Sequence, residues 1–537
     1  MNPAPESNPD PDPAYQTLAE LIRQHARERP DHTALLQGDE RLSYAALDAL
    51  MDRTAASLQR DGLRPGDVIA ICANASPRYA AVFLGALRAG VAVAPLAPSV
   101  TRESFASMLG DAQARWLFVD AAALHALGGA TGADGAAAAA DAADATRCIS
   151  LDGIAPGRAF DAWLMPDGAR PEPVEVEPAH PFNIIYSSGT TGAPKGIVQS
   201  HGMRWTHVMR GATYGYASDG VTLLATPLYS NTTLVVFFPT LAFGGSVILM
   251  EKFDAAAYLA LAAQHRVTHT MLVPVQYQRL MALPSFGAHD LGSFKFKFCT
   301  SAPFAAALKA DVVARWPGGL VEFYGMTEGG GTCILEAHAQ PDKLHTVGRP
   351  AQGHDIRLID DAGCELPAGD TSAIGEVVGH SGGMMSSYHR QPGKTREAEW
   401  FDALGKRFIR TGDIGRFDAD GFLTLLDRKK DMVISGGFNI YPSDLEAVLR
   451  EHAAVLDVAV VGVPSVQWGE TPVAFVVRRD GSELGADELL RWLNERVGKT
   501  QRLASLAYLD ELPRSAIGKV LKRELRDAHV KSGKALR

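Results

Sequence analysis

The chain has 537 residues, of which 46% are hydrophobic and 21% are charged. This composition is close to ordinary globular usage and excludes a disordered, collagen-like or coiled-coil chain. The formal net charge of −9 argues against a protein dedicated to coating nucleic acid. At roughly 100–200 residues per domain, the length predicts several structural units.

The cysteines and the N-terminal segment indicate the cellular compartment in which the protein is expected. The five cysteines form no CxxC pair and are odd in number, which argues against a disulfide framework or a zinc site. The segment that starts at Met1 has neither a basic nor an apolar region of the kind found in secretory signals. We therefore expect a cytoplasmic protein.

The first 150 residues alternate between predicted helices and strands. Helical spacing begins at Leu18, and Ser43 is a candidate N-cap for a helix that runs to about Arg60. Short apolar runs at 68–73, 91–96 and 116–119 predict strands. This alternation predicts parallel βα units. The Ala-rich residues 121–147 predict a surface helix or loop without chemistry.

A second α/β stretch is predicted from about residue 183 to 335. The uncharged stretch from Thr233 to Met250 is interrupted by Pro239, Gly244 and Gly245. It therefore predicts a buried helix, a turn and a buried strand, and no membrane span. A glycine-rich region with short strands follows to about residue 426.

The pattern changes after a charge cluster at residues 427–431. Helices are predicted at 444–451 and 487–497, and strands at 458–463 and 471–477. Short alternating helices and strands predict a small α+β domain. We expect an N-terminal domain over 1–427, a C-terminal domain over 428–537, and a hinge at the boundary.

A loop rich in glycine, hydroxyls and lysine runs from Tyr186 to Gly196. An apolar run precedes it and a helical pattern follows it, so backbone N–H groups, hydroxyls and one cation are available to a polyphosphate. The loop is not a Walker A motif, because Pro194 precedes Lys195 and Gly196 follows it. P-loop kinases and GTPases are therefore disfavoured.

This loop resembles the signature loop of the adenylate-forming superfamily, which includes acyl- and aryl-CoA synthetases, firefly luciferases and peptide-synthetase adenylation domains. Five further strings resemble the motifs of that superfamily in the expected order, and acyl- or aryl-CoA ligases are the members most similar to this chain. The strings are Phe323–Glu328, Gly375–Tyr388, Thr411–Asp413, Asp427–Pro442 and Pro513–Lys519.

The resemblance implies an α/β fold with a large N-terminal domain for ATP and the acid. That domain combines α/β subdomains with a small distorted β-barrel, and a mobile α+β lid domain carries the catalytic lysine. The implied reaction activates an aryl or medium aliphatic carboxylic acid with ATP and Mg²⁺, and then transfers the acyl group to coenzyme A. Two alternatives stay open: an enzyme that loads a separate acyl carrier protein, and a pseudoenzyme that binds nucleotide without turnover.

The resemblance also assigns roles at the nucleotide. Lys519, Thr327 and Glu328 are the expected catalytic residues, and Thr190 and Glu328 would lie near Mg²⁺. The positions expected around the phosphates are Ser187, Ser188, Gly189, Thr190, Thr191 and Lys195. The positions expected around adenine and ribose are Ser301, Ala302, Pro303, Glu322, Phe323, Tyr324, Asp413 and Arg428.

The remaining expectations concern the acid and the thiol. Lys430 matches the family's hinge position, and Gly436 and Gly437 resemble the loop that admits the pantetheine arm. Ser230 stands where many CoA ligases have histidine. Gly329 and Gly330, in a triple glycine, suggest either a widened pocket floor or a flexible turn. The other expected pocket walls are Trp205, His207, Met209, Tyr229 and Asn231, and none of these is an obvious cation, which disfavours a dicarboxylate.

Overall fold

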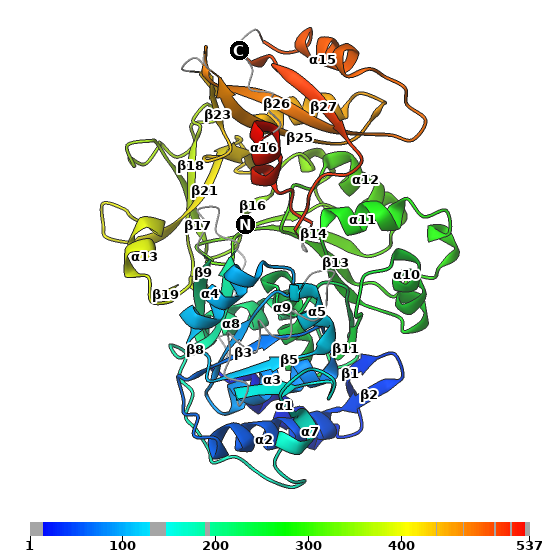
Figure 1. The fold of residues 1–537 in the computed structure, drawn as a ribbon, viewed down its shortest axis with the longest axis vertical. Coiled ribbons are helices and arrows are strands. Elements are labelled where there is room, and N and C mark those ends of the chain that lie inside the picture. The colour runs from blue at the N-terminus through cyan, green and yellow to red at the C-terminus, as the bar shows by residue number, and fades with distance from the viewer. Residues whose placement is uncertain are drawn as a thin grey trace, which may run out of the picture.

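The structure is a computed structural model, and it describes residues 14–128, 147–187, 194–435, 438–465, 467–498, 501–515 and 518–531. Figure 1 shows the C-terminal domain, in orange and red, at the opposite end of the molecule from helices α1 (Leu18–Glu28), α2 (Tyr44–Arg60) and α3 (Pro77–Arg88). No helix in the described ranges is long and apolar enough to cross a membrane.

The first large sheet has the strand order β19-β9-β8-β4-β3-β5-β6-β7. The apolar runs fold as expected into parallel strands, because a strand buried on both faces needs apolar side chains on both. The strands are β3 (Val68–Cys72), β4 (Ala92–Pro95), β5 (Trp116–Val119), β6 (Cys148–Ser150), β7 (Arg158–Ala159), β8 (Pro181–Ser187), β9 (Lys195–Ser200) and β19 (Ser387–Tyr388). Associated helices are α4 (Arg102–Ala112), α5 (Ala121–Gly128), α7 (Phe160–Trp163) and α8 (His201–Arg210).

The second large sheet has the order β16-β15-β14-β13-β12-β10-β11-β1-β2. Its strands are β1 (Thr33–Gln37), β2 (Glu40–Ser43), β10 (Val221–Leu224), β11 (Ser246–Leu249), β12 (His269–Leu272), β13 (Phe296–Cys299), β14 (Gly319–Tyr324), β15 (Cys333–Glu336) and β16 (Arg349–Pro350). Its helices are α9 (Asn231–Ala242), α10 (Ala255–Gln264), α11 (Pro274–Met281), α12 (Ala306–Arg315) and the 3₁₀ turns η3 (Gly211–Tyr214), η4 (Phe286–Ala288) and η5 (Pro341–Lys343).

Helix α9 is the buried helix expected before the turn at Gly244. Pro239, which interrupts the uncharged stretch in the sequence, lies inside this helix, which continues to Ala242. Proline in the last turn removes one backbone bond, and nearly every residue of the helix is buried, so tertiary packing outweighs that loss. The Thr240 hydroxyl also donates to the Val236 carbonyl at 2.7 Å.

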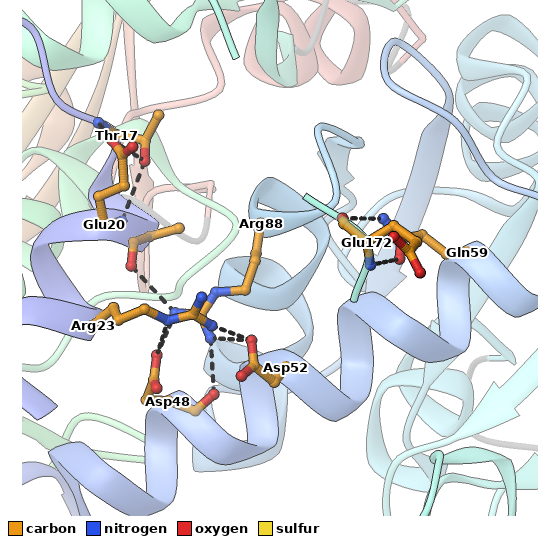
Figure 2. A network of polar contacts seen from close by, with 9 residues as sticks. Thr17, Glu20, Arg23, Asp48, Asp52, Gln59, Arg88 and Glu172 are labelled. Atoms are coloured by element: carbon orange, nitrogen blue, oxygen red, sulfur yellow. Dashed lines mark hydrogen bonds and ion pairs between the residues drawn. The ribbon is translucent and has the colours of Figure 1, made fainter. Parts of the chain in front are cut away.

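A buried ion-pair network joins α1, α2 and α3 (Figure 2). The Arg88 guanidinium donates to Asp48 Oδ1 at 2.6 Å and to Asp52 Oδ1 at 2.9 Å, and Arg23 pairs with the same two carboxylates. The two guanidinium groups balance the two carboxylates, so each charged group in the network has a partner of opposite sign. Ser43 caps α2 as expected, with its hydroxyl accepting from the Ala46 N–H at 3.2 Å.

Two smaller sheets complete the chain. The antiparallel sheet β17-β18-β21-β20, with β22 paired to β21, lies where the small distorted barrel was expected. The C-terminal sheet has the order β24-β23-β26-β25, with β27 beside β26. The elements are β17 (Asp355–Ile359), β18 (Gly375–His380), α13 (Pro392–Ala398), β20 (Glu399–Phe401), β21 (Arg407–Phe417), β22 (Leu423–Arg428), β23 (Val433–Ser435), β24 (Phe438–Ile440), α14 (Pro442–Arg450), β25 (Val455–Ser465), β26 (Gly469–Arg478), α15 (Ala486–Asn494), β27 (Ser505–Leu509) and α16 (Lys522–Lys531).

Candidate active site

A cavity of about 910 Å³ lies where the two large sheets, the β17–β22 sheet and the C-terminal domain meet. Thirteen of the expected residues line it: Lys195, His207, Tyr229, Ser230, Asn231, Ser301, Phe323, Thr327, Glu328, Gly329, Arg428, Lys430 and Lys519. The first and last of these residues, Lys195 and Lys519, are 324 positions apart in the sequence. Only the fold brings them together.

Several expected site residues lie elsewhere or outside the described ranges. Ser188, Gly189, Thr190, Thr191, Gly436 and Gly437 are outside the residues that the structure describes, and Ser187 is described only as the last residue of β8. The residues that are described but are not among the cavity walls are Trp205, Met209, Ala302, Pro303, Glu322, Tyr324, Gly330 and Asp413.

Glu328 is the carboxylate at the centre of the cavity wall. Its Oε1 accepts a hydrogen bond from the Tyr388 hydroxyl at 2.8 Å, and the Lys195 ammonium lies 5.0 Å from the centre of the Tyr388 ring. One hydrogen bond uses only part of the acceptor capacity of a carboxylate, so Glu328 can still bind a hard cation. Lysine and carboxylate are therefore held beside one aromatic ring.

A buried polar network fixes the backbone at Thr327. The Gln199 amide donates to the Thr327 carbonyl at 2.7 Å, and its oxygen accepts from Asn183 at 2.9 Å. Arg204 donates to the Asn183 amide oxygen at 2.9 Å and also to Gln199. Burial lowers the pKa of Arg204 to about 9, which is still mostly protonated at neutral pH. This network positions the backbone that carries Thr327 on the cavity wall.

Of the residues expected around adenine, Ser301 and Phe323 line the cavity. Ser301 lines the cavity with φ +80°, a left-handed conformation that is strained for serine, and its hydroxyl lies 2.6 Å from the Thr232 hydroxyl. Glu322, however, turns away from the cavity and forms a buried ion pair with Lys309. Burial raises the pKa of Glu322, and Lys309 opposes that shift. Alternation along β14 explains this, because successive side chains point to opposite faces.

The expected ribose carboxylate is held in place by two neighbours. Asp413 Oδ1 pairs with Arg428 Nε at 2.9 Å, and Oδ2 accepts from the Tyr324 hydroxyl at 2.9 Å. Arg428, Thr411 and Gly412 line the cavity beside it. Each carboxylate oxygen retains a free lone pair, so the pair of oxygens can still accept two hydroxyls.

Lys519 reaches the cavity from the C-terminal domain. Its loop is a tight turn in which the Gly518 N–H donates to the Ser515 carbonyl at 2.8 Å, and the Arg514 guanidinium donates to the Gly518 carbonyl at 2.6 Å. Burial, with Arg428 and Lys430 adding to it, lowers the pKa of Lys519 to about 8. The C-terminal domain therefore adds a positive charge to a site that already contains Arg428 and Lys430. This charge favours the binding of an anionic substrate.

The acid-pocket residues expected on α8 do not all share one face. His207 lines the cavity, whereas Trp205 packs edge-on against Tyr15, with ring centres 5.9 Å apart. A helix turns about 100° per residue, so residues two apart from His207 lie on the other side. The residue that shares its face is Arg210, which lines the cavity and which the sequence analysis overlooked. The spacing i, i+3 on a predicted helix was the available signal.

The triple glycine neither widens a pocket floor nor forms a free turn. Gly329, Gly330 and Gly331 have φ values of +75°, +86° and +137°, and a Cβ on Gly329 would lie 1.9 Å from the Gly383 carbonyl oxygen. A Cβ on Gly330 would lie 2.7 Å from Ile409 Cβ. Glycine is required here because the backbone packs directly against the β17–β22 sheet. Gly330 is consequently buried, and of the three only Gly329 lines the cavity.

Fold and site together describe a nucleotide-dependent enzyme of the adenylate-forming class. The family model described as AMP-binding enzyme matches residues 22–389, and the model described as AMP-binding enzyme C-terminal domain matches residues 444–519. The chain therefore belongs to the AMP-binding enzyme family. It is an AMP-forming acid–thiol ligase, a class that uses ATP, Mg²⁺ and coenzyme A.

Relatives of known activity cover almost the whole chain. A feruloyl-CoA synthase from an Amycolatopsis species is 34% identical over 95% of this chain and 99% of its own length. The fatty acid–acyl-carrier-protein ligase ScoC of Streptomyces coeruleorubidus is 30% identical over 96% of this chain and 97% of its own length. ATP-bound MatB from Rhodopseudomonas palustris has a TM-score of 0.84 at 29% identity, covering 97% of this chain and 100% of that chain.

Proposed function

We propose that this enzyme converts a carboxylic acid and ATP into an acyl-adenylate and pyrophosphate, and then transfers the acyl group to the thiol of coenzyme A. The observation that carries the proposal is that Lys519 from the C-terminal domain lines the same cavity as Lys195, Thr327 and Glu328. A cavity with cations from two domains suits a polyphosphate that must lose pyrophosphate.

In the first step the acid's carboxylate oxygen bonds to the α-phosphorus and the bond to the β-phosphate bridging oxygen breaks. Negative charge grows on that bridging oxygen, and Lys519 and Lys195 are the candidates to stabilise it. The acid is its own nucleophile, so the protein's task is to orient it. Gln199 supports this task by holding the Thr327 carbonyl and by approaching the Asn231 amide at 3.5 Å.

The residues present fit Mg²⁺. Glu328 is a hard carboxylate on the cavity wall with acceptor capacity left beyond its bond to Tyr388. Among the described residues no cluster of three His, Cys, Asp or Glu side chains could enclose a metal, so the other ligands would be phosphate oxygens, water and the expected Thr190. When bound, Mg²⁺ neutralises charge on the β- and γ-phosphates.

In the second step the thiol attacks the acyl carbon and AMP leaves. Coenzyme A is the acceptor that the CoA-ligase relatives support. A second candidate is the phosphopantetheine of a separate carrier protein, because ScoC is named for that acceptor and is similar over nearly the whole chain. The cavity chemistry of the first step is common to both.

Pyrophosphate and AMP release across a panel of acids tests the proposal and separates the acceptors. We expect acid-dependent release that becomes multiple-turnover with coenzyme A, with the acyl-CoA detected by mass spectrometry. Release that stays near one equivalent with coenzyme A but turns over with a holo carrier protein would support the second candidate. ATP binding without acid-dependent release from any acid would contradict both and indicate a pseudoenzyme.

A further inference from the structure

We propose that the acid substrate carries a second carboxylate, remote from the reacting one, and that Arg210 binds it. This inference rests on the proposed function and adds the substrate class. It starts from the last turn of α8, where Arg210 lines the cavity and its guanidinium carbon lies 5.9 Å from the centre of the Phe323 ring.

Arg210 has no hydrogen bond and no carboxylate partner among the described residues. Its guanidinium lies over the Phe323 ring, and it interacts electrostatically with Tyr214, His207 and His354. Burial lowers the pKa of Arg210 from its ordinary value, although a guanidinium normally stays charged at neutral pH. A half-buried charge without a counter-ion is unfavourable unless a ligand supplies one.

Arg204, six residues before Arg210 on the same helix, provides an internal comparison. It is fully buried, yet Asn183 and Gln199 accept its hydrogen bonds and the rings of Phe182 and Phe238 flank it. Hydrogen bonds thus tie Arg204 into the framework, although its Nη1 is buried without a hydrogen-bond partner in the described part of the chain. Arg210 differs because it lines the cavity and forms no hydrogen bond with a described residue.

Two imidazoles and a phenol surround Arg210. His207 lies one turn earlier, and its Nδ1 is buried without a partner in the described part of the chain. His354 lies before β17 and its Nδ1 accepts from the Thr332 N–H at 2.8 Å, so Nε2 carries the hydrogen. Burial, with Arg210 and His380 adding to it, lowers the pKa of His354 to about 4, so it is neutral at pH 7. Tyr214 also lines the cavity.

One cation with neutral donors beside it matches a single carboxylate. The guanidinium fork can donate to both oxygens, and the His354 N–H or the Tyr214 hydroxyl can donate to a remaining lone pair. Val235, Val236, Pro239, Met271 and Phe298 line the same cavity, so the body of the acid between its two carboxylates is expected to be apolar.

The test measures kcat/KM for matched pairs of acids: adipate against hexanoate, and terephthalate against 4-methylbenzoate, each with ATP and coenzyme A. We expect the wild type to favour the dicarboxylate of at least one pair. Arg210→Met should lower that preference by about 10²-fold or more, the usual consequence of removing one partner of a buried charge pair. The monoacid of that pair should be turned over as well or better, because the variant removes an unpaired charge.

Arg315→Met is the matched control. Arg315 also lies over an aromatic ring, 5.0 Å from the centre of Phe286, but it is on α12 and does not line the cavity. It should leave the acid preference unchanged. Equal preference for mono- and dicarboxylates in the wild type, or a rise in KM for ATP in Arg210→Met that is the same for every acid, would overturn the proposal.

A binding measurement separates this proposal from the proposed function. The thermal midpoint of wild type and Arg210→Met is measured with AMP plus each acid, which needs no turnover and shows that the variant is folded. A rise with the dicarboxylate that is lost in Arg210→Met supports the second-carboxylate site even if coenzyme A is not acylated. No rise with either dicarboxylate, alongside turnover of monoacids, would overturn the inference and leave the proposed function intact.

Discussion

Single residues set the electrostatics of the cavity, and Lys519 is the one whose state changes near neutral pH. Burial and the neighbouring Arg428 and Lys430 lower the pKa of its ammonium to about 8. Glu328 and Asp413 are by contrast held by neutral or cationic donors. The positive charge of the free site therefore favours polyphosphate binding. The contribution of Lys519 to this effect can be measured by mutation and by pH.

Lys519→Ala should separate the two half-reactions. Adenylate formation should fall by roughly 10²–10³-fold, because one preorganised cation is lost from the developing charge. Thioester formation from supplied acyl-adenylate should be largely spared, because the resemblance implies that the C-terminal domain rotates away for that step. The measurements are acid-dependent pyrophosphate release and acyl-CoA formation from synthetic acyl-adenylate.

Lys531→Ala, which removes an exposed lysine at the end of α16, serves as the control and should change neither rate. Equal loss of both half-reactions in Lys519→Ala would contradict the assignment of Lys519 to adenylation alone.

The pH dependence of kcat/KM for ATP should report the titration of Lys519. The protonated form is the low-pH form, so kcat/KM for ATP should decline as pH rises through about 8. Lys519→Arg should retain a charged side chain and lose this alkaline limb, because a guanidinium titrates above pH 12 or so. An unchanged limb in the arginine variant would assign the titration to another group.

At the scale of elements, the site depends on how closely β14 and its loop approach the β17–β22 sheet. The loop after Glu328 packs closely here, with Gly329 against the backbone of Gly383, just after β18, and Gly330 against the Gly379 backbone and the Ile409 side chain. The Met385 N–H also donates to the Glu328 carbonyl at 2.7 Å. Glu328 is thus positioned by the contact between two sheets.

Gly329→Ala should therefore loosen this contact. The new Cβ would meet the Gly383 oxygen at 1.9 Å, and φ +75° adds the strain of a left-handed L-residue. A loss of about 2–5 kcal/mol of stability is expected from strain and overpacking together, measured by denaturant unfolding. Gly353→Ala has φ +76° with nothing within 4 Å, so it reports the strain alone and should cost about 1–2 kcal/mol. Equal losses would show that the close approach is not what requires glycine at 329.

The whole molecule works as two domains that share one cavity. The large domain supplies Lys195, Thr327 and Glu328, and the C-terminal domain supplies Lys519. The turn that carries Lys519 contacts the large domain directly, because a Cβ on Gly518 would lie 2.9 Å from Val275 Cγ1. The hinge at Lys430, the boundary near residue 428 and the assignment of this arrangement to adenylation remain predictions.

Gly518→Ala should disfavour this arrangement. Overpacking against Val275 is worth typically 1–3 kcal/mol, so adenylate formation should fall roughly tenfold while thioester formation from supplied acyl-adenylate changes little. Gly481→Ala, in the same domain with φ +80° and nothing within 4 Å, should leave the ratio of the two rates unchanged. The same ratio in both variants would contradict a contact that is specific to adenylation.

Much of the molecule could be predicted from the sequence because the information is local. Apolar runs bounded by turn residues marked β3, β5 and β11, Ser43 marked the start of α2, and ordered strings such as Thr411–Asp413 identified the class. A short polar motif contacts the ligand through residues that are close in the sequence. Such a motif can therefore be recognised without knowing which distant residues pack against it.

Only the tertiary structure decided which of these residues face one another. The sequence could not show that Glu322 pairs with Lys309 or that the triple glycine packs against another sheet. Both depend on atoms that are distant in the chain. For Arg210 the helical spacing from His207 was a local signal, but only the fold shows that this face lines the cavity. The sequence by itself determined the chemistry that the enzyme performs on ATP, and the fold decided the shape and charge that the acid meets.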